Sequence, residues 1–214
     1  MGPRTNRLVM IIGGKGSGKT SLGRSVLLQL LREHTDRFGL VVDTLDHPSY
    51  RDIVQITPDM ISRARRGVYR VFGSDTGVIM SEIQQGAYNC VAMFEDAAKY
   101  FDGKLTTAQE KFVLDSKQMN LDLIFMFHGY SFVPPKLYRL VDSVWILKTM
   151  DSPAASRGKV TCLEQLNAAY EKVSALADYH TKGKEQALLT GSAPNYPGWE
   201  KPEYEFPRES LLLN

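Results

Sequence analysis

The sequence predicts an α/β fold with a central, mostly parallel sheet flanked by helices. Short apolar runs alternate with longer segments of helical periodicity, an order typical of parallel sheets. Several of the runs are apolar almost throughout, as expected for strands that are covered on both faces. The predicted strands are Leu8–Gly13, Gly39–Thr44, Val68–Gly73, Cys90–Glu95, Leu121–His128 and Ser143–Lys148.

Helix signals lie between the predicted strands. The segment Ser21–Arg32 has apolar residues at helical spacing. Thr57 and Pro58 predict a helix start, with an N-cap followed by proline at the first helical position. Overlapping capping boxes begin at Thr106 and Thr107, because each of them has a glutamine or glutamate three residues later.

Composition sets limits on the class of protein. The chain has 214 residues, of which 43% are hydrophobic and 23% charged, so it can bury a sizeable core. A net charge of +2 excludes a strongly basic histone-like protein and an acidic tail. Cys90 and Cys162 are too few for a disulfide framework, which favours a reducing compartment. The polar N-terminus predicts no signal peptide, and the longest strictly apolar run, Leu123–Phe127, predicts no transmembrane segment.

The pattern changes near residue 150, which predicts two parts. Residues 1–150 are expected to form the core. Residues 151–214 are expected to pack on the core or on a neighbour. They comprise a helix over Cys162–Thr181 and a proline-rich tail over Gly191–Pro207, where four prolines exclude a helix or a central strand.

The strongest motif follows the first predicted strand. Residues 13–20 read GGKGSGKT and match G-x-x-x-x-G-K-[ST], a phosphate-binding loop between a strand and a helix. Its glycines let backbone N–H groups face a phosphate, and the helix adds its positive N-terminal end. Lys19 would reach the β- and γ-phosphates of ATP, and the Thr20 hydroxyl would bind Mg²⁺. The predicted nucleotide contacts are Gly13, Gly14, Lys15, Gly16, Ser17, Gly18, Lys19, Thr20 and Ser21.

Two adjacent carboxylates close another predicted strand. Residues 91–94 are apolar and are followed by Glu95 and Asp96. In an ATP-hydrolysing site one such carboxylate holds the Mg²⁺ shell and the other polarises the attacking water. The alternative is an acidic strand end that only caps the next segment.

A polar residue also ends the predicted strand Leu121–His128. In open α/β sheets, ligands bind outside the carboxyl ends of the strands. His128 could therefore sense the γ-phosphate or position water. A satisfied structural histidine is the alternative.

With these elements placed, the chain resembles the FtsK–HerA superfamily of P-loop motor ATPases. It is most similar to genome-packaging ATPases of membrane-containing icosahedral viruses and to zonula-occludens-toxin-like ATPases of filamentous phages. The resemblance covers residues 8–150 and rests on the phosphate loop, the acidic strand and the block Leu114–His128. It implies a RecA-like P-loop NTPase fold and a basic residue ahead of the sensor strand.

The sequence departs from the family pattern in three ways. Glu95 precedes Asp96, whereas the family usually has aspartate before glutamate. His128 stands where the family has glutamine. Lys117 stands where the family has its arginine finger, and a lysine lacks the planar fork that spreads charge over a phosphoryl group. By position, Glu95 takes the Mg²⁺ role, Asp96 the water-polarising role and Lys117 the finger role.

The resemblance implies a motor that moves double-stranded DNA through phosphate contacts, as a homo-oligomeric ring. Viral capsid or membrane-vertex proteins would be partners, in the host cytoplasm or the virion. Arg63, Arg65 and Arg66, with Arg70, form the densest basic cluster. It is either a DNA- or subunit-facing patch or a solvated helix end. Two other functions stay open, a small nucleotide or metabolite kinase and a non-motor NTP-dependent switch.

Overall fold

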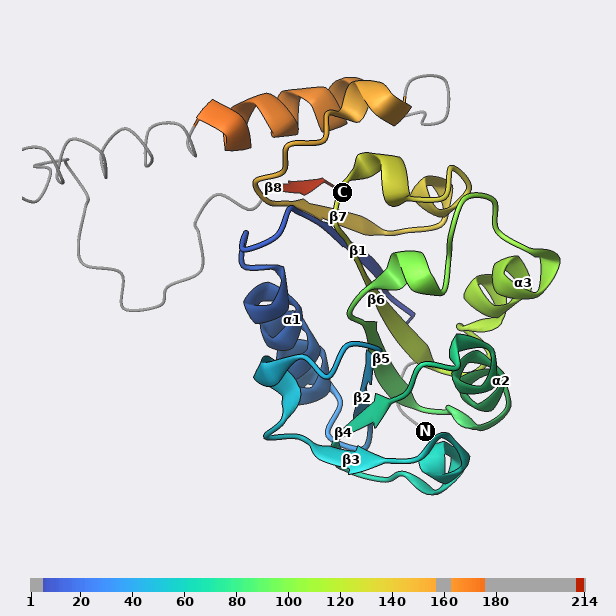
Figure 1. The fold of residues 1–214 in the computed structure, drawn as a ribbon. Coiled ribbons are helices and arrows are strands. Elements are labelled where there is room, and N and C mark those ends of the chain that lie inside the picture. Colours follow the sequence, from blue (N-terminus) through green and yellow to red (C-terminus); the bar gives the residue numbers. More distant parts are fainter. Residues whose placement is uncertain (1–5, 157–162, 176–210, 214) are drawn as a thin grey trace, which may run out of the picture.

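The computed structural model describes residues 6–156, 163–175 and 211–213, and it confirms the α/β prediction (Figure 1). The sheet has eight strands in the order β3-β4-β2-β5-β6-β1-β7-β8. Strands β1 to β7 pair in parallel, and β8 pairs antiparallel to β7. The strands are β1 (Leu8–Ile12), β2 (Phe38–Asp43), β3 (Val54–Ile56), β4 (Gly67–Phe72), β5 (Cys90–Phe94), β6 (Leu121–Phe127), β7 (Ser143–Ile146) and β8 (Leu211–Leu213).

Helices cover both faces of the sheet. The α-helices are α1 (Lys19–Glu33), α2 (Thr76–Gly86) and α3 (Thr107–Asp115), and residues 163–175 are also helical. Short 3₁₀ turns link the other elements: η1 (Pro48–Tyr50), η2 (Pro58–Arg63), η3 (Ala97–Lys99), η4 (Tyr130–Phe132), η5 (Leu137–Arg139) and η6 (Pro153–Ser156). In Figure 1, α1 lies on one side of the sheet, and α2 and α3 lie on the other.

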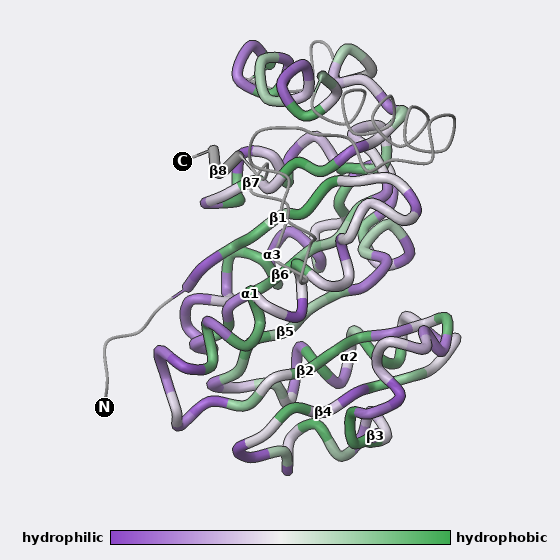
Figure 2. Tube along the Cα trace, turned by 90° about the vertical axis from the view of Figure 1, so that its left-hand side faces the viewer, coloured by the Kyte–Doolittle hydropathy of each residue, from purple (hydrophilic) through white to green (hydrophobic). Residues whose placement is uncertain are grey.

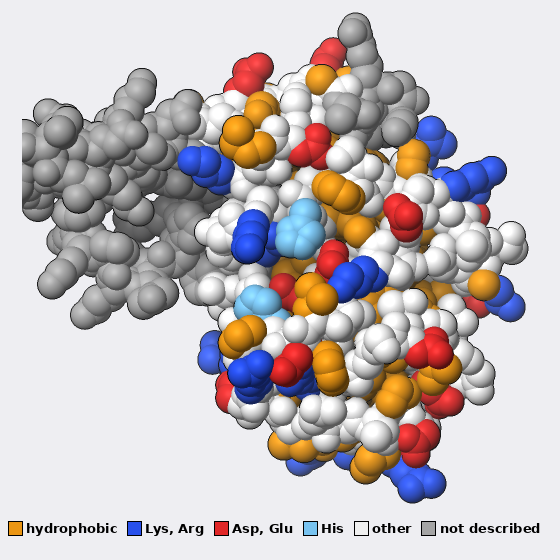
Figure 3. Space-filling model, in the orientation of Figure 1, with side chains coloured by type: hydrophobic (Ala, Val, Ile, Leu, Met, Phe, Trp, Pro, Cys, Tyr) orange, Lys and Arg blue, Asp and Glu red, His pale blue; other side chains and the backbone are white. Residues whose placement is uncertain are grey.

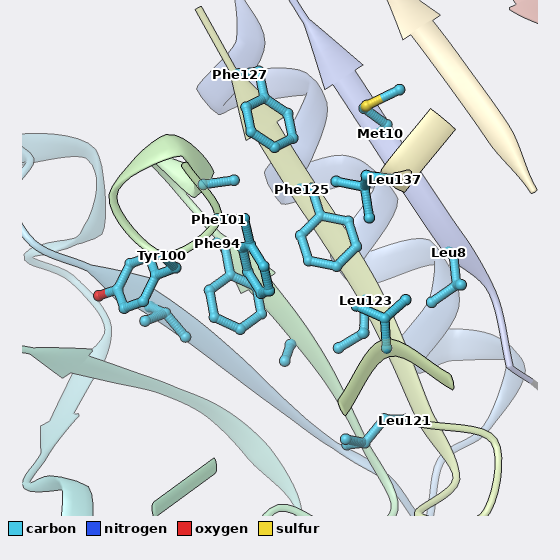
Figure 4. Packing of buried hydrophobic residues seen from close by; sticks show 14 of the residues in the cluster. Leu8, Met10, Phe94, Tyr100, Phe101, Leu121, Leu123, Phe125, Phe127 and Leu137 are labelled. Carbon is cyan, nitrogen blue, oxygen red and sulfur yellow. The ribbon is translucent and has the colours of Figure 1, made fainter. Parts of the chain in front are cut away.

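Alternate side chains of the central strands build two separate cores. Val9 and Ile11 of β1 pack toward α1, whereas Met10 and Ile12 pack on the opposite face. On that opposite face, Phe94, Phe101 and Phe125 contact one another, with ring centroids 5.1–5.7 Å apart (Figure 4). The strands therefore lack the polar alternation of a solvent-facing sheet, and the tube in Figure 2 is hydrophobic along β1, β5 and β6.

A glycine lets α1 lie close to the sheet. A Cβ atom at Gly23 would come 2.7 Å from Met126 Sδ and 2.9 Å from Met93 Sδ. These two methionines belong to β6 and β5, respectively. The absence of a side chain at position 23 thus brings α1 against both strands.

The predicted elements are present with small changes. Each of the six predicted strands ends within two residues of its prediction, and the helix over 21–32 lies inside α1. The Thr106 capping box is formed with both of its hydrogen bonds. Pro58 does start a helix, but it is a 3₁₀ turn and the Thr57 side chain makes no cap bond. The sequence analysis missed α2 and the short strands β3 and β8.

The described residues include part of the predicted C-terminal helix. The helix at 163–175 lies within the predicted Cys162–Thr181 helix, whose two ends fall outside the described residues, as does the tail Gly191–Pro207. Leu166 and Val173 are buried against the main core, and the Tyr170 ring contacts that of Tyr130. The division at residue 150 stays a prediction. Within the described residues, no helix is long and apolar enough to cross a membrane.

A buried ion pair joins the amino ends of the strands. Arg37 Nη1 lies 2.6 Å from Asp122 Oδ2, and both side chains are 1% exposed. The same guanidinium donates to the carbonyls of Cys90 and Asn120, and Asp122 also accepts the Arg7 N–H. The pair therefore links the amino ends of β1, β2, β5 and β6.

We expect Asp122→Asn to destabilise the protein strongly. Removing one member of a buried ion pair leaves the other charge uncompensated, which costs about 3–5 kcal/mol. Denaturant unfolding measures this loss. Asp52→Asn is the control because it breaks the exposed Arg24–Asp52 pair, and we expect a much smaller shift in midpoint. Equal shifts for the two variants would contradict a special role for the buried pair.

Candidate nucleotide-binding site

The phosphate-binding loop is anchored to β6 and to the segment that follows β7. Gly13 N–H donates to the Phe127 carbonyl at 3.1 Å, and Gly14 N–H donates to the Lys148 carbonyl at 2.8 Å. Gly16 and Gly18 have φ angles of 74° and 93°, a region that glycine adopts without steric cost. The loop is thus held at the carboxyl edge of the sheet between β6 and β7.

The loop and the start of α1 form a cradle for an anion. The first turn of a helix has N–H groups without intrahelical partners, and the first turn of α1 contains no acidic residue. Among the described residues, the buried Ser17 hydroxyl has no hydrogen-bond partner. Lys15 and Gly16 are exposed at the tip of the loop. These unsatisfied donors fit a phosphate group.

Lys19 is buried although it carries a charge. It is 8% exposed, its Nζ donates to the Gly14 carbonyl at 2.8 Å, and Nζ lies 3.3 Å from His128 Nδ1. Burial lowers the pKa of Lys19, and the nearby charges of Glu95 and Asp96 oppose that shift. The ammonium group thus lies among four other predicted site residues: Gly14, Glu95, Asp96 and His128.

The two predicted metal-binding groups are neighbours. The Thr20 hydroxyl donates to Glu95 Oε1 at 3.1 Å, across β6, which lies between β1 and β5. Oxygen donors of this kind fit Mg²⁺, which at phosphate sites usually takes one or two protein groups and completes its shell with phosphate and water. No group of three or more His, Cys, Asp or Glu within the described residues could hold a metal by itself.

Asp96 and His128 lie close to each other beside Lys19. Asp96 Oδ1 is 3.9 Å from His128 Nε2, and Asp96 Oδ2 is 3.6 Å from Lys99 Nζ. Lys99 also donates to the Thr44 hydroxyl. The structure therefore brings Asp96 and His128 together with Lys19, while their catalytic roles stay predictions. Figure 3 shows histidine, basic and acidic side chains close together on this side of the molecule.

Tyr50 belongs to the site and was missed by the sequence analysis. It is fully buried, and its hydroxyl donates to Glu95 Oε2. Burial, followed by the Glu95 charge, raises the pKa of Tyr50, so the phenol stays a hydrogen-bond donor at neutral pH. No local motif surrounds Tyr50, and its contact with Glu95 spans 45 residues of sequence.

The predicted basic cluster is divided by the fold, and the inclusion of Arg70 was wrong. Arg70 is 3% exposed and lies 2.7 Å from both Asp43 and Asp46, so it is a buried structural residue. Arg63, Arg65 and Arg66 are exposed and precede β4. The cluster therefore lies at the amino edge of the sheet, opposite the phosphate loop.

Lys117 also lies away from the phosphate loop of its own chain. It is exposed in the turn between α3 and β6, at the amino edge of the sheet. The phosphate loop and Glu95 lie at the carboxyl edge. A contact between Lys117 and nucleotide would therefore require a second subunit.

Solved structures of a viral protein share this fold. The genome packaging NTPase B204 from Sulfolobus turreted icosahedral virus 2, in complex with ATP-gammaS, has a TM-score of 0.62 and 17% sequence identity. The match covers 76% of this chain and 86% of that chain. B204, the DNA-packaging ATPase from Sulfolobus Turreted Icosahedral Virus, has a TM-score of 0.59 and 18% identity, with 81% and 89% coverage. At such identities the similarity shows a common fold.

A further solved structure is less similar to this chain. The N-terminal domain of zonular occludens toxin from Neisseria meningitidis has a TM-score of 0.43 and 12% identity over 66% of this chain and 76% of that chain. No protein-family model matches the chain, and no curated protein matches it.

We expect Lys19→Ala to weaken nucleotide binding without unfolding the protein. The change removes a charged donor but leaves the backbone cradle, and hydrogen bonds to charged groups contribute about 1.5–3 kcal/mol. The affinity for a fluorescent ADP analogue should fall about tenfold or more. Lys111→Ala is the control because Lys111 is exposed on α3. Equal affinity in the wild type and a folded Lys19→Ala protein would refute the phosphate site.

Proposed function

We propose that the protein is an ATP-hydrolysing motor that translocates double-stranded DNA, of the viral genome-packaging type. The observation that carries the hydrolytic part is the Thr20–Glu95 contact beside the buried Lys19, next to a loop of unsatisfied donors. The resemblance of residues 8–150 to packaging ATPases and the fold shared with B204 support the DNA-moving part.

Each residue of the site has a task in hydrolysis. The loop N–H groups and the α1 terminus would hold the β-phosphate, and Lys19 would bridge the β- and γ-phosphates. Thr20 and Glu95 would hold Mg²⁺, which neutralises charge on the phosphates. Asp96 would accept a proton from the attacking water, and His128 would hydrogen-bond that water or the γ-phosphate.

The kinase alternative is weaker because of where the arginines lie. A small-molecule kinase needs arginines around a second phosphate near the first. Of the arginines in the predicted cluster, Arg70 lies within β4 and is bound by Asp43 and Asp46. The other three, Arg63, Arg65 and Arg66, lie at the edge of the sheet opposite the phosphate loop. The switch alternative differs from a motor in that DNA would not alter phosphate release.

A ring assembly follows from the same proposal. In a ring, Lys117 of one subunit would approach the nucleotide of the next, because it lies too far from its own phosphate loop to act there. Viral capsid or membrane-vertex proteins would then be partners, and the motor would work in the host cytoplasm or on the virion. Exposed arginines would contact DNA phosphates without reading sequence.

We expect double-stranded DNA to stimulate ATP hydrolysis, and specific activity to rise with protein concentration as rings form. Phosphate release measured with and without DNA, across protein concentrations, tests both expectations. Phosphoryl transfer to a small acceptor would favour the kinase. Phosphate release that DNA leaves unchanged would favour the switch.

Charge variants separate DNA contact from hydrolysis in the same assay. Replacing Arg63, Arg65 and Arg66 with alanine should reduce DNA stimulation and its salt sensitivity while basal hydrolysis persists. Three exposed lysines, replaced together with alanine, give a control with the same loss of positive charge: Lys104, Lys111 and Lys172. Unchanged DNA binding in the arginine variant would show that the cluster is a solvated surface without a role in DNA contact.

We expect the two adjacent carboxylates to have separable roles. Asp96→Asn should keep nucleotide and Mg²⁺ binding while hydrolysis falls by about two or more orders of magnitude, as for loss of a general base. Glu95→Gln should weaken Mg²⁺ dependence and nucleotide affinity together. Single-turnover hydrolysis and Mg²⁺ titration distinguish these outcomes. The roles are reversed if Glu95→Gln traps unhydrolysed ATP and Asp96→Asn loses Mg²⁺ binding.

A further inference from the structure

The segment between β2 and β3, residues 44–53, is fixed against the site by its own contacts. Its first half is held by Asp43, whose carboxylate accepts the N–H groups of Leu45 and His47 at 2.9 Å each. Asp43 is fully buried and paired with Arg70. The start of the segment is therefore attached to the carboxyl edge of the sheet.

The second half of the segment is held by α1. Arg24, one helical turn after Thr20, donates to the Ser49 carbonyl, and its Nη2 lies 2.8 Å from Asp52 Oδ2. This arginine places the segment beside the first two turns of the helix that follows the phosphate loop. Tyr50 lies between Ser49 and Asp52, the two residues that Arg24 binds.

Tyr50 itself is directed at the carboxylate of Glu95. Its side chain is fully buried, its ring lies 5.6 Å from that of His47, and its hydroxyl donates to Glu95 Oε2. The other oxygen, Oε1, accepts the Thr20 hydroxyl. Both oxygens of Glu95 are thus bound by hydroxyl groups from two different segments of the chain.

We propose that Tyr50 is a positioning residue that holds the Glu95 carboxylate in place for Mg²⁺. This inference rests on the proposed function, because it concerns the same metal site. A glutamate side chain has several rotatable bonds, and fixing it costs conformational entropy. The Tyr50 hydroxyl fixes it before the metal arrives. Thr20 and Glu95 would hold Mg²⁺, and Tyr50 would keep the Glu95 carboxylate oriented through its other oxygen.

The hydroxyl is not required for packing alone. Phenylalanine would fill nearly the same space and keep the contact with His47. A buried hydroxyl is unfavourable unless it is hydrogen-bonded, and here its partner is an ionisable group of the site. Partners that orient metal ligands commonly change metal affinity about 10- to 100-fold when they are removed.

Tyr50→Phe tests this inference through metal binding rather than turnover. Nucleotide affinity is measured with a fluorescent ADP analogue over a Mg²⁺ titration, and Mn²⁺ bound with ADP is followed by electron paramagnetic resonance. We expect the metal concentration at half-saturation to rise about 10- to 100-fold. Affinity in the presence of a chelator should equal that of the wild type.

Tyr138→Phe is the matched control. Tyr138 is also buried, and its hydroxyl donates to a backbone carbonyl, that of Tyr130, rather than to a carboxylate of the site. This variant also removes a buried tyrosine hydroxyl, so it reports any general loss of stability in thermal unfolding. It should leave the Mg²⁺ titration unchanged. An equal shift in both tyrosine variants would overturn the proposal.

A double variant checks that Tyr50 acts through Glu95. If it does, adding Tyr50→Phe to Glu95→Gln should change the metal titration far less than Tyr50→Phe changes the wild type. The proposal would be overturned if Tyr50→Phe shifted the Mg²⁺ titration equally in the wild type and in Glu95→Gln. It would also be overturned if the Mg²⁺ titration of Tyr50→Phe equalled that of the wild type. A wild-type protein without Mg²⁺-dependent nucleotide binding would instead refute the proposed function, so the two failures are distinguishable.

Discussion

The candidate site depends on a buried positive charge that needs negative partners. An unpaired ammonium group in a protein interior is strongly unfavourable, yet Lys19 is 8% exposed. The carboxylates of Glu95 and Asp96 offset the cost of burying it. They can do so because α1 passes from β1 to β2 across β6 and β5, and because Gly23 lets it lie against both. The close packing of α1 on β5 and β6 therefore also brings Lys19, at the start of α1, near the carboxylates that follow β5.

Polar residues at the same edge of the sheet have different tasks. Asp43 ends β2 next to β5, but its carboxylate is used by Arg70 and by backbone N–H groups. Such a group is already neutralised and cannot serve a metal as well. Glu95, one strand away, receives only hydroxyl donors in the described contacts, and these can yield to a cation. The partners of a carboxylate, rather than its position alone, separate a structural residue from a candidate metal ligand.

Local patterns predicted the parts of the fold that are locally determined. Apolar runs predicted six strands, and the motif GGKGSGKT predicted the phosphate-binding loop. Both signals lie within a few adjacent residues. Strand β3 was missed because it has three residues and two of them are exposed. Arg70 was misplaced because a run of arginines does not tell which of them a strand turns inward. Tyr50 had no local signal, since its role requires residues 44–53 to fold back onto α1.

The order of the two acids agrees with their different reach. Glu95 still follows the sheet, because its N–H donates to the Val42 carbonyl at 3.1 Å, and its long side chain extends to Thr20. Asp96 is already in the turn, with φ −124° and ψ 72°, so its shorter side chain faces Lys99 and His128 instead. In its proposed metal role, Glu95 gains reach but has one more rotatable bond to restrain than aspartate would have. A fixed donor on its second oxygen supplies that restraint, which is why a tyrosine from a distant segment belongs in this site.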